Sequence, residues 1–160
     1  HDRINDPELN IDENCILFVR NVGPVGYPGA AEVVNMQPSD ALIAQGINHL
    51  PTVGDGRQSG TSESPSILNA SPEAAVGGGL LYLETNDRVR LDVPGRRLEA
   101  LVDEAEWERR KATKKPHYPE NQTPWQELFR NHVGQLSGGG CLEFATNYQR
   151  VGEKLPRDNH

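Results

Sequence analysis

Short apolar runs separated by loops rich in glycine and proline predict short strands and short helices along the whole chain. Five segments have the length and composition of strands: residues 15–19, 49–53, 80–84, 89–93 and 97–101. In 89–93, apolar and polar residues alternate, which is typical of a strand with one face in water. Tight turns would join the last three strands, so the pattern indicates a small antiparallel sheet or barrel.

Helix signals are clearest after Asp103. Glu106 follows it by three residues, as in a capping box, and faces Arg110 at i,i+4, while Pro116 ends the helix. Shorter helices are expected at 30–36, 39–45, 72–76 and 125–133, and a last strand is expected at 142–148. Ser71 would be the N-cap of the helix at 72–76, with Pro72 as its first residue.

These elements indicate an α+β domain with a mostly antiparallel or barrel-like β core flanked by short helices. We expect an irregular arm over residues 1–14, the core and its helix over 15–115, and an extension over 116–160. The chain begins at His1 and its single methionine is Met36, so we expect one domain of a longer protein.

Composition and charge exclude several classes of function. The 160 residues are 35% hydrophobic and 24% charged, and no apolar run approaches the length of about 18 residues that spans a bilayer. No signal peptide is visible, so we expect a cytoplasmic protein without a membrane role. A net charge of −7 argues against nucleic-acid binding. The basic residues near Arg109 alternate with glutamates, which indicates a solvated helix face.

The first glycine-rich loop, residues 23–29, follows the strand expected at 15–19. Its Gly and Pro residues cannot continue a regular element, which indicates a loop of defined shape. Glu32 is the one acidic residue of 23–36. In the first turn of a helix, its carboxylate would be stabilised by the helix dipole by about 0.3–1 kcal/mol. Alternatively, Glu32 is a hard oxygen ligand for Mg²⁺.

The second glycine-rich loop, residues 54–62, follows the strand expected at 49–53. Glycines on either side of Ser59 would let the backbone approach a substrate and would leave the Ser59 and Thr61 hydroxyls accessible. The alternative is a turn or anion-binding loop, with Asp55 and Arg57 as an ion pair that holds it. The loop matches neither a hydrolase nucleophile elbow nor a P-loop.

Four sequence blocks together resemble the carboxy-terminal domain of the dihydroxy-acid, phosphogluconate and sugar-acid dehydratases. The blocks are GYPGAAE at 26–32, GDGRQSGT at 54–61, SPEAAVGG at 71–78 and DRVRLDVPG at 87–95. They keep the order and spacing of the family from residue 16 to about residue 110. The GYPG form and the tail at 118–127 and 155–160 are similar to the aldonate branch, and to pentonate dehydratases within it.

The resemblance implies a hydro-lyase that converts a sugar acid, such as the pentonates D-xylonate or L-arabinonate, to a 2-keto-3-deoxy acid. It implies Ser59 as the base at C2, Thr61 as an assisting hydroxyl and Glu32 as a magnesium ligand. It also implies that Gly60 and Arg57 contact the substrate. The implied fold is a swivelling β/β/α domain.

The same resemblance implies two cofactors, Mg²⁺ and a [2Fe-2S] cluster that acts as Lewis acid for the departing 3-hydroxyl. Cys15 and Cys141 match none of the cluster motifs of the family. We therefore expect the cluster ligands in an amino-terminal domain outside this chain, and a homodimer or homotetramer when that domain is present.

Three alternatives stay open. One is a dihydroxy-acid dehydratase of branched-chain amino-acid synthesis, and another is a non-catalytic module that binds an anionic metabolite. The third is a structural or interaction domain anchored by Trp107, Trp125 and Phe129. The spacing of these aromatics favours packing in the core or in a subunit interface.

Overall fold

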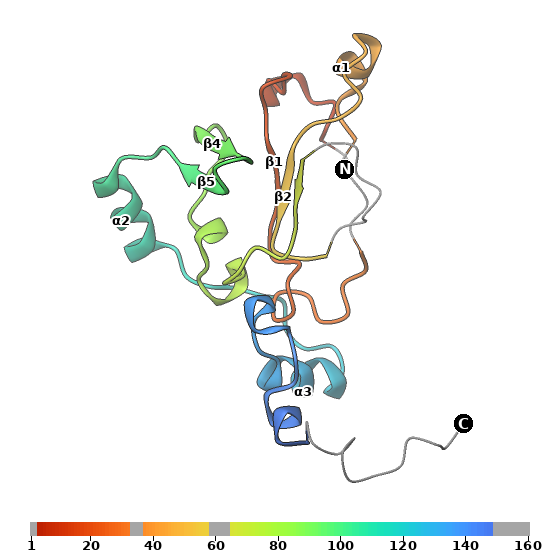
Figure 1. Cartoon of the computed structure of the whole chain (residues 1–160), viewed down its shortest axis with the longest axis vertical. Coiled ribbons are helices and arrows are strands. Elements are labelled where there is room, and N and C mark those ends of the chain that lie inside the picture. Colours follow the sequence, from red (N-terminus) through yellow and green to blue (C-terminus); the bar gives the residue numbers. More distant parts are fainter. Residues whose placement is uncertain (1–2, 33–36, 58–64, 149–160) are drawn as a thin grey trace.

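A computed structural model describes residues 3–32, 37–57 and 65–148, in which two small sheets are combined with short helices. Strands β1 (Leu17–Val19), β2 (Thr52–Gly54) and β3 (Ser66–Ile67) form a parallel sheet in that order. Strands β4 (Val89–Asp92) and β5 (Arg97–Ala100) form an antiparallel hairpin. Figure 1 shows the hairpin beside the parallel sheet.

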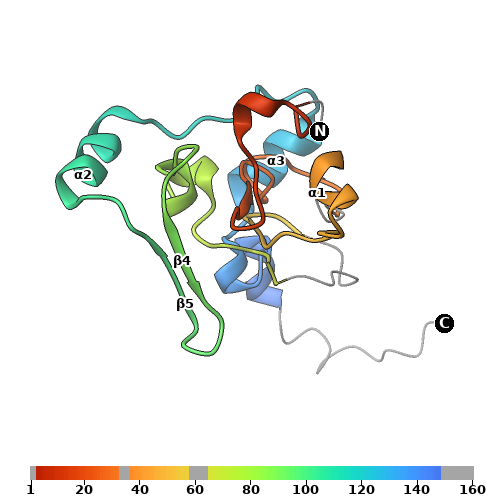
Figure 2. The ribbon, with the colours of Figure 1, turned by 90° about the horizontal axis from the view of Figure 1, so that it is seen from above.

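The described residues also contain three α-helices and five 3-10 helices, of which α1, η2 and η3 lie between strands. The α-helices are α1 (Asp40–Ala44), α2 (Glu104–Thr113) and α3 (Pro124–His132). The 3-10 helices are η1 (Pro7–Leu9), η2 (Ala74–Val76), η3 (Gly79–Leu81), η4 (Leu136–Gly138) and η5 (Glu143–Tyr148). In both ribbon views α2 and the hairpin lie to one side, away from α3 (Figures 1 and 2). No helix of the described residues has the length and apolar character needed to cross a membrane.

The α+β class is confirmed, but the expectation of a mostly antiparallel core is wrong. The larger sheet is parallel, because β1, β2 and β3 are joined by the crossing segments 20–51 and 55–65 and not by hairpin turns. Within the described residues, the two sheets stay separate and no barrel closes.

Two expected strands are wrong for a related reason. The apolar run at 80–84 lies partly in η3, where Leu80 and Leu81 pack into the core, and the segment 142–148 forms η5 after one isolated bridge. Short apolar runs pack equally well from a helical turn, so hydrophobic pattern alone does not separate the two structures. The hairpin consequently turns at Pro94 and Gly95, with β4 pairing with β5.

Two expected helix starts are also wrong. Ser71 is not an N-cap: Ser71-Pro72 is a cis peptide bond, and η2 begins after Glu73. Residues 30–32 are not helical, and 33–36 lie outside the described residues. The helices expected at 39–45, after Asp103 and at 125–133 are confirmed as α1, α2 and α3.

The core consists of two small clusters that meet at η2. Val53, Ala74 and Leu80 form one, and Val25, Ala75 and Val133 form the other. Adjacent residues of η2 thus belong to different clusters, and both are almost fully buried. The segment around η2 therefore joins the parallel sheet to the part of the chain that contains α3.

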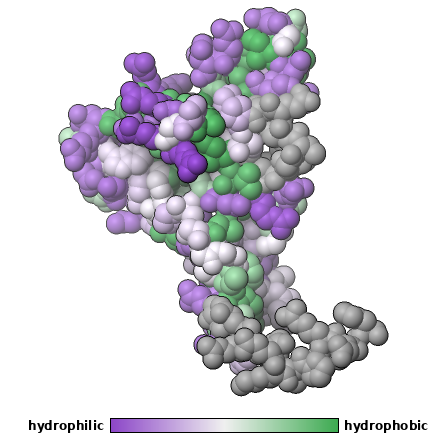
Figure 3. Space-filling model, in the orientation of Figure 1, coloured by the Kyte–Doolittle hydropathy of each residue, from purple (hydrophilic) through white to green (hydrophobic). Residues whose placement is uncertain are grey.

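Helix α2 is attached through one buried cation. Asp103 caps its first turn, and the Arg110 side chain, 8% exposed, contacts Asp87 at 2.6 Å and Glu106 at 2.7 Å. Trp107 packs edge-on against Tyr82, with ring centroids 5.8 Å apart. The solvated face expected for the basic residues of α2 is therefore wrong for Arg110, whereas Arg109 and Lys111 face solvent as expected. The surface over this side of the molecule is mostly hydrophilic (Figure 3).

Candidate functional site

Both glycine-rich loops start at the same edge of the parallel sheet. β1 ends at Val19 and β2 ends at Gly54, and these two residues are partners in the register. In parallel sheets the loops that follow neighbouring strands meet at the carboxyl edge, where ligands of such folds commonly bind. The topology therefore brings the loop at 21–29 beside the start of the loop at 54–62.

Asp55 connects the two loops. Its side chain is fully buried and accepts hydrogen bonds from the backbone N–H of Asn21 at 3.0 Å, of Val22 at 3.1 Å and of Ala74 at 2.8 Å. A buried carboxylate needs such donors, because loss of its hydration is costly. Asp55 therefore holds the loops, which agrees with the alternative left open for it, but its described contacts are to backbone amides and not the ion pair with Arg57 that this alternative assumed.

A second buried carboxylate, Glu73, holds the first loop further along. Its oxygens accept the N–H of Gly26 at 2.8 Å and of Val25 at 3.0 and 3.1 Å. The side-chain amide of Gln135 donates to Glu73 at 2.9 Å, and its oxygen accepts the backbone N–H of Glu73 at 2.8 Å. Glu73 is 1% exposed, so these donors replace water around the charge.

Arg130 of α3 contacts the carbonyl groups of the same two residues, Val25 and Gly26. Its Nε donates to the oxygen of Val25 at 2.8 Å and one Nη donates to the oxygen of Gly26 at 3.3 Å. The guanidinium lies 4.6 Å from the centre of the Tyr118 ring and donates to Asn121. The part of the chain after α2 therefore helps to shape the first loop.

Close approach explains two of the glycines. A Cβ on Gly23 would lie 2.5 Å from Oε2 of Glu73, and a Cβ on Gly56 would lie 2.5 Å from the backbone oxygen of Val22. Neither position leaves room for a side chain. The glycines that signalled a shaped loop in the sequence thus permit the packing of one loop against the other.

The structure describes only some of the residues expected in the site. Glu32 is exposed at the end of the first loop, and Arg57 is exposed in the second. Ser59, Gly60 and Thr61 lie outside the described residues. Asp55 fixes the backbone two residues before Arg57 and four before Ser59.

Glu32 can serve as one ligand of a magnesium site, but it does not form such a site alone. It is an accessible carboxylate on a loop fixed by buried hydrogen bonds, and Mg²⁺ takes hard oxygen ligands of this type. Within residues 3–32, 37–57 and 65–148, no group of three or more His, Cys, Asp and Glu side chains could hold a metal ion. Further ligands would have to come from elsewhere.

The two cysteines do not fit an iron–sulfur cluster. Both are free, and the Sγ of Cys15 lies 3.4 Å from a carboxylate oxygen of Asp12, whereas that of Cys141 contacts the carbonyl of Gly139 at 3.8 Å. Burial raises the pKa of the Cys15 thiol, which favours the protonated form over the thiolate that a cluster requires.

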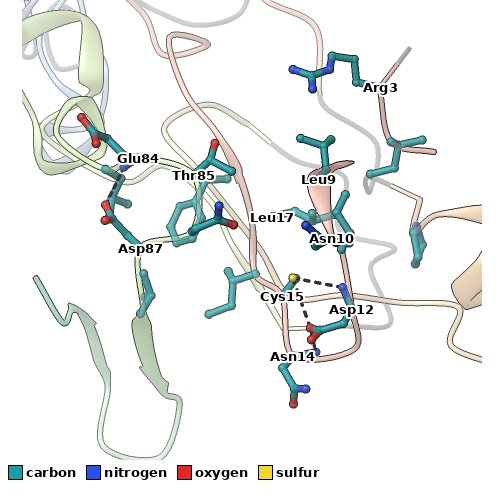
Figure 4. A pocket seen from close by; sticks show the side chains of 18 of the residues that line it. Arg3, Leu9, Asn10, Asp12, Asn14, Cys15, Leu17, Glu84, Thr85 and Asp87 are labelled. Atoms are coloured by element: carbon teal, nitrogen blue, oxygen red, sulfur yellow. Dashed lines mark hydrogen bonds between the residues drawn. The ribbon is translucent and has the colours of Figure 1, made fainter. Parts of the chain in front are cut away.

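A cavity in the described residues lies away from the two loops. It has a volume of about 970 Å³ and is lined by the N-terminal segment and by residues 83–89, with Cys15, Leu17 and Thr85 among the side chains around it (Figure 4). Neither Glu32 nor Asp55 lines it. We therefore place the candidate site at the loops.

Sequence reasoning missed three residues that shape the site, Glu73, Arg130 and Gln135. The contacts by which they shape the loop are to backbone groups 47 or more residues away, or to each other, which no local motif reveals. One signal was present: the acidic Glu73 stands inside the block at 71–78, in an otherwise apolar setting. The aromatic Phe129 packs against the core as expected, whereas Trp125 is 75% exposed.

Comparison with known proteins identifies the family of the chain. Residues 1–140 match the sequence model of the family described as dihydroxy-acid/6-phosphogluconate dehydratase, C-terminal. The D-xylonate dehydratase of Caulobacter vibrioides is 60% identical to the chain over all 160 of its residues, and the alignment covers 27% of that dehydratase. The L-arabinonate dehydratase of Rhizobium leguminosarum bv. trifolii is 39% identical over 99% of the chain, and the alignment covers 27% of that dehydratase. A dihydroxy-acid dehydratase of Methanothrix thermoacetophila is 38% identical over 79% of the chain.

The chain spans about a quarter of the length of these relatives. Both glycine-rich loops and the segment with Glu73 fall within the matched residues. By this match the chain belongs to the dihydroxy-acid/6-phosphogluconate dehydratase family and corresponds to its C-terminal domain.

Proposed function

We propose that this chain is the C-terminal domain of a hydro-lyase that removes water from a sugar acid to give a 2-keto-3-deoxy acid. The observation that carries the proposal is the meeting of the two loops at the carboxyl edge of β1 and β2, with the family blocks in both. Similarity to D-xylonate and L-arabinonate dehydratases favours a pentonate as substrate. A 6-deoxy-6-sulfo-D-gluconate dehydratase is also related, at 35% identity.

In this proposal the chain supplies the base. Ser59 removes the proton from C2, the 3-hydroxyl leaves as water, and the resulting enol becomes the 2-keto acid. Thr61 assists Ser59, while Gly60 and Arg57 contact the substrate. A serine needs nearby donors or positive charge to act as a base at neutral pH.

Glu32 would hold Mg²⁺ together with ligands from the rest of the protein, and that ion would stabilise negative charge on the substrate. A [2Fe-2S] cluster belongs to the proposal only through the resemblance, and its ligands would lie outside this chain. A swivelling β/β/α type of domain, a homodimer or homotetramer and a cytoplasmic location complete the proposal. Two free cysteines are in keeping with that location.

Steady-state dehydration by the full-length protein, purified without air, tests the proposal against a panel of pentonates, hexonates and branched-chain dihydroxy acids. We expect turnover of D-xylonate or L-arabinonate. A preference for the branched-chain dihydroxy acids would favour the other branch of the family. Binding of sugar acids without turnover, with Mg²⁺ and cluster present, would favour a non-catalytic module.

A further inference from the structure

The backbone at Val25 and Gly26 is held on both of its polar sides. Glu73 accepts the two N–H groups at 2.8 to 3.1 Å, and Arg130 donates to the two carbonyl oxygens at 2.8 and 3.3 Å. Gln135 fixes Glu73 through two hydrogen bonds of its own. The backbone groups of two consecutive residues, spread over three peptide units, are thus bound by a carboxylate and a guanidinium that lie far from them in the sequence.

Short hydrogen-bonded turns lead from the Val25–Gly26 backbone toward Glu32. The N–H of Tyr27 donates to the oxygen of Gly23 at 2.9 Å, and the N–H of Ala30 donates to the oxygen of Tyr27 at 2.9 Å. Glu32 follows two residues later, with an exposed side chain. Together, these two turns connect the backbone that Glu73 and Arg130 hold to the residues just before Glu32.

Stability alone is a poor explanation for this arrangement. A buried carboxylate often contributes no more to folding than a well-packed apolar side chain would, because desolvation offsets its hydrogen bonds. Its hydrogen bonds are directional, however, and they constrain the position of the backbone. Groups that hydrogen-bond directly to a metal ligand change the affinity of the site by about 10–100-fold when they are removed, and a group that positions the loop of a ligand acts in the same direction.

We infer that Glu73, Arg130 and Gln135 form a clamp on the peptides of Val25 and Gly26 that positions Glu32 for Mg²⁺. The inference rests on the proposed function, in which Glu32 is a magnesium ligand. The three residues of the clamp are positioning residues, since they act through the loop and not on the substrate.

The clamp offers a variant that breaks it and a variant that restores it. In Glu73→Gln, one oxygen becomes an NH₂ group, so a single oxygen remains for the donors from Gly26 and Gln135. The pair Glu73→Gln with Gln135→Glu restores the match, because the carboxylate introduced at position 135 can accept from both the new amide and the backbone N–H of residue 73. The negative charge then stays within the clamp but moves from position 73 to position 135.

The test measures binding of Mn²⁺, as a spin probe for the magnesium site, to the full-length enzyme by electron paramagnetic resonance. We expect Glu73→Gln to weaken Mn²⁺ binding on the order of tenfold. The pair with Gln135→Glu should recover most of that loss. Asp87→Asn, which perturbs the distant attachment of α2, serves as the control for general destabilisation and should bind Mn²⁺ as the wild type does.

Equal Mn²⁺ affinity of Glu73→Gln and Asp87→Asn would overturn the inference, as would absence of recovery in the pair. If Glu73→Gln does not fold, Arg130→Gln removes the other half of the clamp and should weaken Mn²⁺ binding similarly. If the wild-type enzyme turns over an aldonate and the clamp variants bind Mn²⁺ as tightly as the wild type does, the clamp alone is refuted. If the wild-type enzyme turns over no sugar acid, the proposed function is refuted. If the wild-type enzyme does not bind Mn²⁺, the clamp is refuted.

Discussion

Oδ2 of Asp55 accepts a hydrogen bond of 2.8 Å from the backbone N–H of Ala74, which links the second glycine-rich loop to η2, where the two core clusters meet. The same carboxylate accepts the N–H groups of Asn21 and Val22 from the first loop. One fully buried side chain therefore sets the relative position of three segments. The consequences of this arrangement can be measured.

Asp55→Asn should destabilise the chain. The amide keeps the shape of the carboxylate but has one acceptor oxygen, so at least one buried N–H loses its partner, at a cost of about 1–3 kcal/mol. Denaturant unfolding checks this. Glu108→Gln is the matched control, since its exposed ion pair with Lys111 contributes at most about 1 kcal/mol. Equal stability of the two variants would contradict the role given to Asp55.

Gly23→Ala should disturb the packing of the loops. The new Cβ would lie 2.5 Å from Oε2 of Glu73 and 2.9 Å from the backbone oxygen of Asp55, and neither group can move freely. Crowding of this kind costs about 1–3 kcal/mol in unfolding free energy. Gly79→Ala is the control, because a Cβ there meets nothing within 4 Å. The account fails here if the two alanine variants have the same midpoint of unfolding.

Acid should loosen α2. Hydrogen bonds from Arg109 and Arg110 lower the pKa of Glu106 from 4.5 to about 2, and Arg110 also lowers the pKa of Asp87. A carboxyl whose pKa is lowered by folding stabilises the folded state above its ordinary pKa. That stabilisation is lost as pH falls from 4.5 toward 2.

Fluorescence of Trp107 on α2, in a Trp125→Phe background, follows this loss because Trp107 packs against Tyr82. Trp125 is 75% exposed, so its replacement should disturb little. In Glu106→Gln the change in fluorescence over the same pH range should be smaller. An unchanged acid transition in that variant would show that other groups control it.

The 160-residue chain alone should be colourless and inactive on aldonates. Its described residues hold no group of three or more metal-ligating side chains, and the two cysteines do not fit a cluster. Visible absorption after anaerobic reconstitution with iron and sulfide, together with a turnover assay, checks both points. A brown chain, or one that dehydrates D-xylonate, would contradict the division of the active site proposed above.

Sequence alone predicted the parts of the fold that local signals specify. Asp103 caps α2 and Glu106 pairs with Arg110 as expected, and the glycine-rich segment after β1 is a shaped loop. The order of strands could not be predicted in the same way, because parallel pairing of β1 with β2 depends on contacts between distant segments. Leu80 and Leu81 show the limit most clearly, since their apolar run fits a strand and a buried helical turn equally well.

In the candidate site, too, residues in local motifs could be predicted and residues with distant partners could not. Glu32 and Arg57 were found from family blocks, and the structure describes both as exposed. For Asp55 a loop-holding ion pair with Arg57 was one of two open alternatives, and its amide partners were not predicted. Glu73 and Arg130 act on the backbone of Val25 and Gly26, and a backbone partner leaves no trace in the sequence. The proposed roles of Ser59, Gly60 and Thr61 stay predictions.

The central claim is that Ser59 is the base of a sugar-acid dehydratase. The most direct measurement is turnover of D-xylonate and L-arabinonate by the full-length enzyme carrying Ser59→Ala, with substrate binding followed in parallel. We predict a loss in kcat of about 10²–10⁴-fold with binding retained, while the neighbouring Ser62→Ala stays active. Full activity of Ser59→Ala, or loss of binding without any effect on kcat, would contradict the claim.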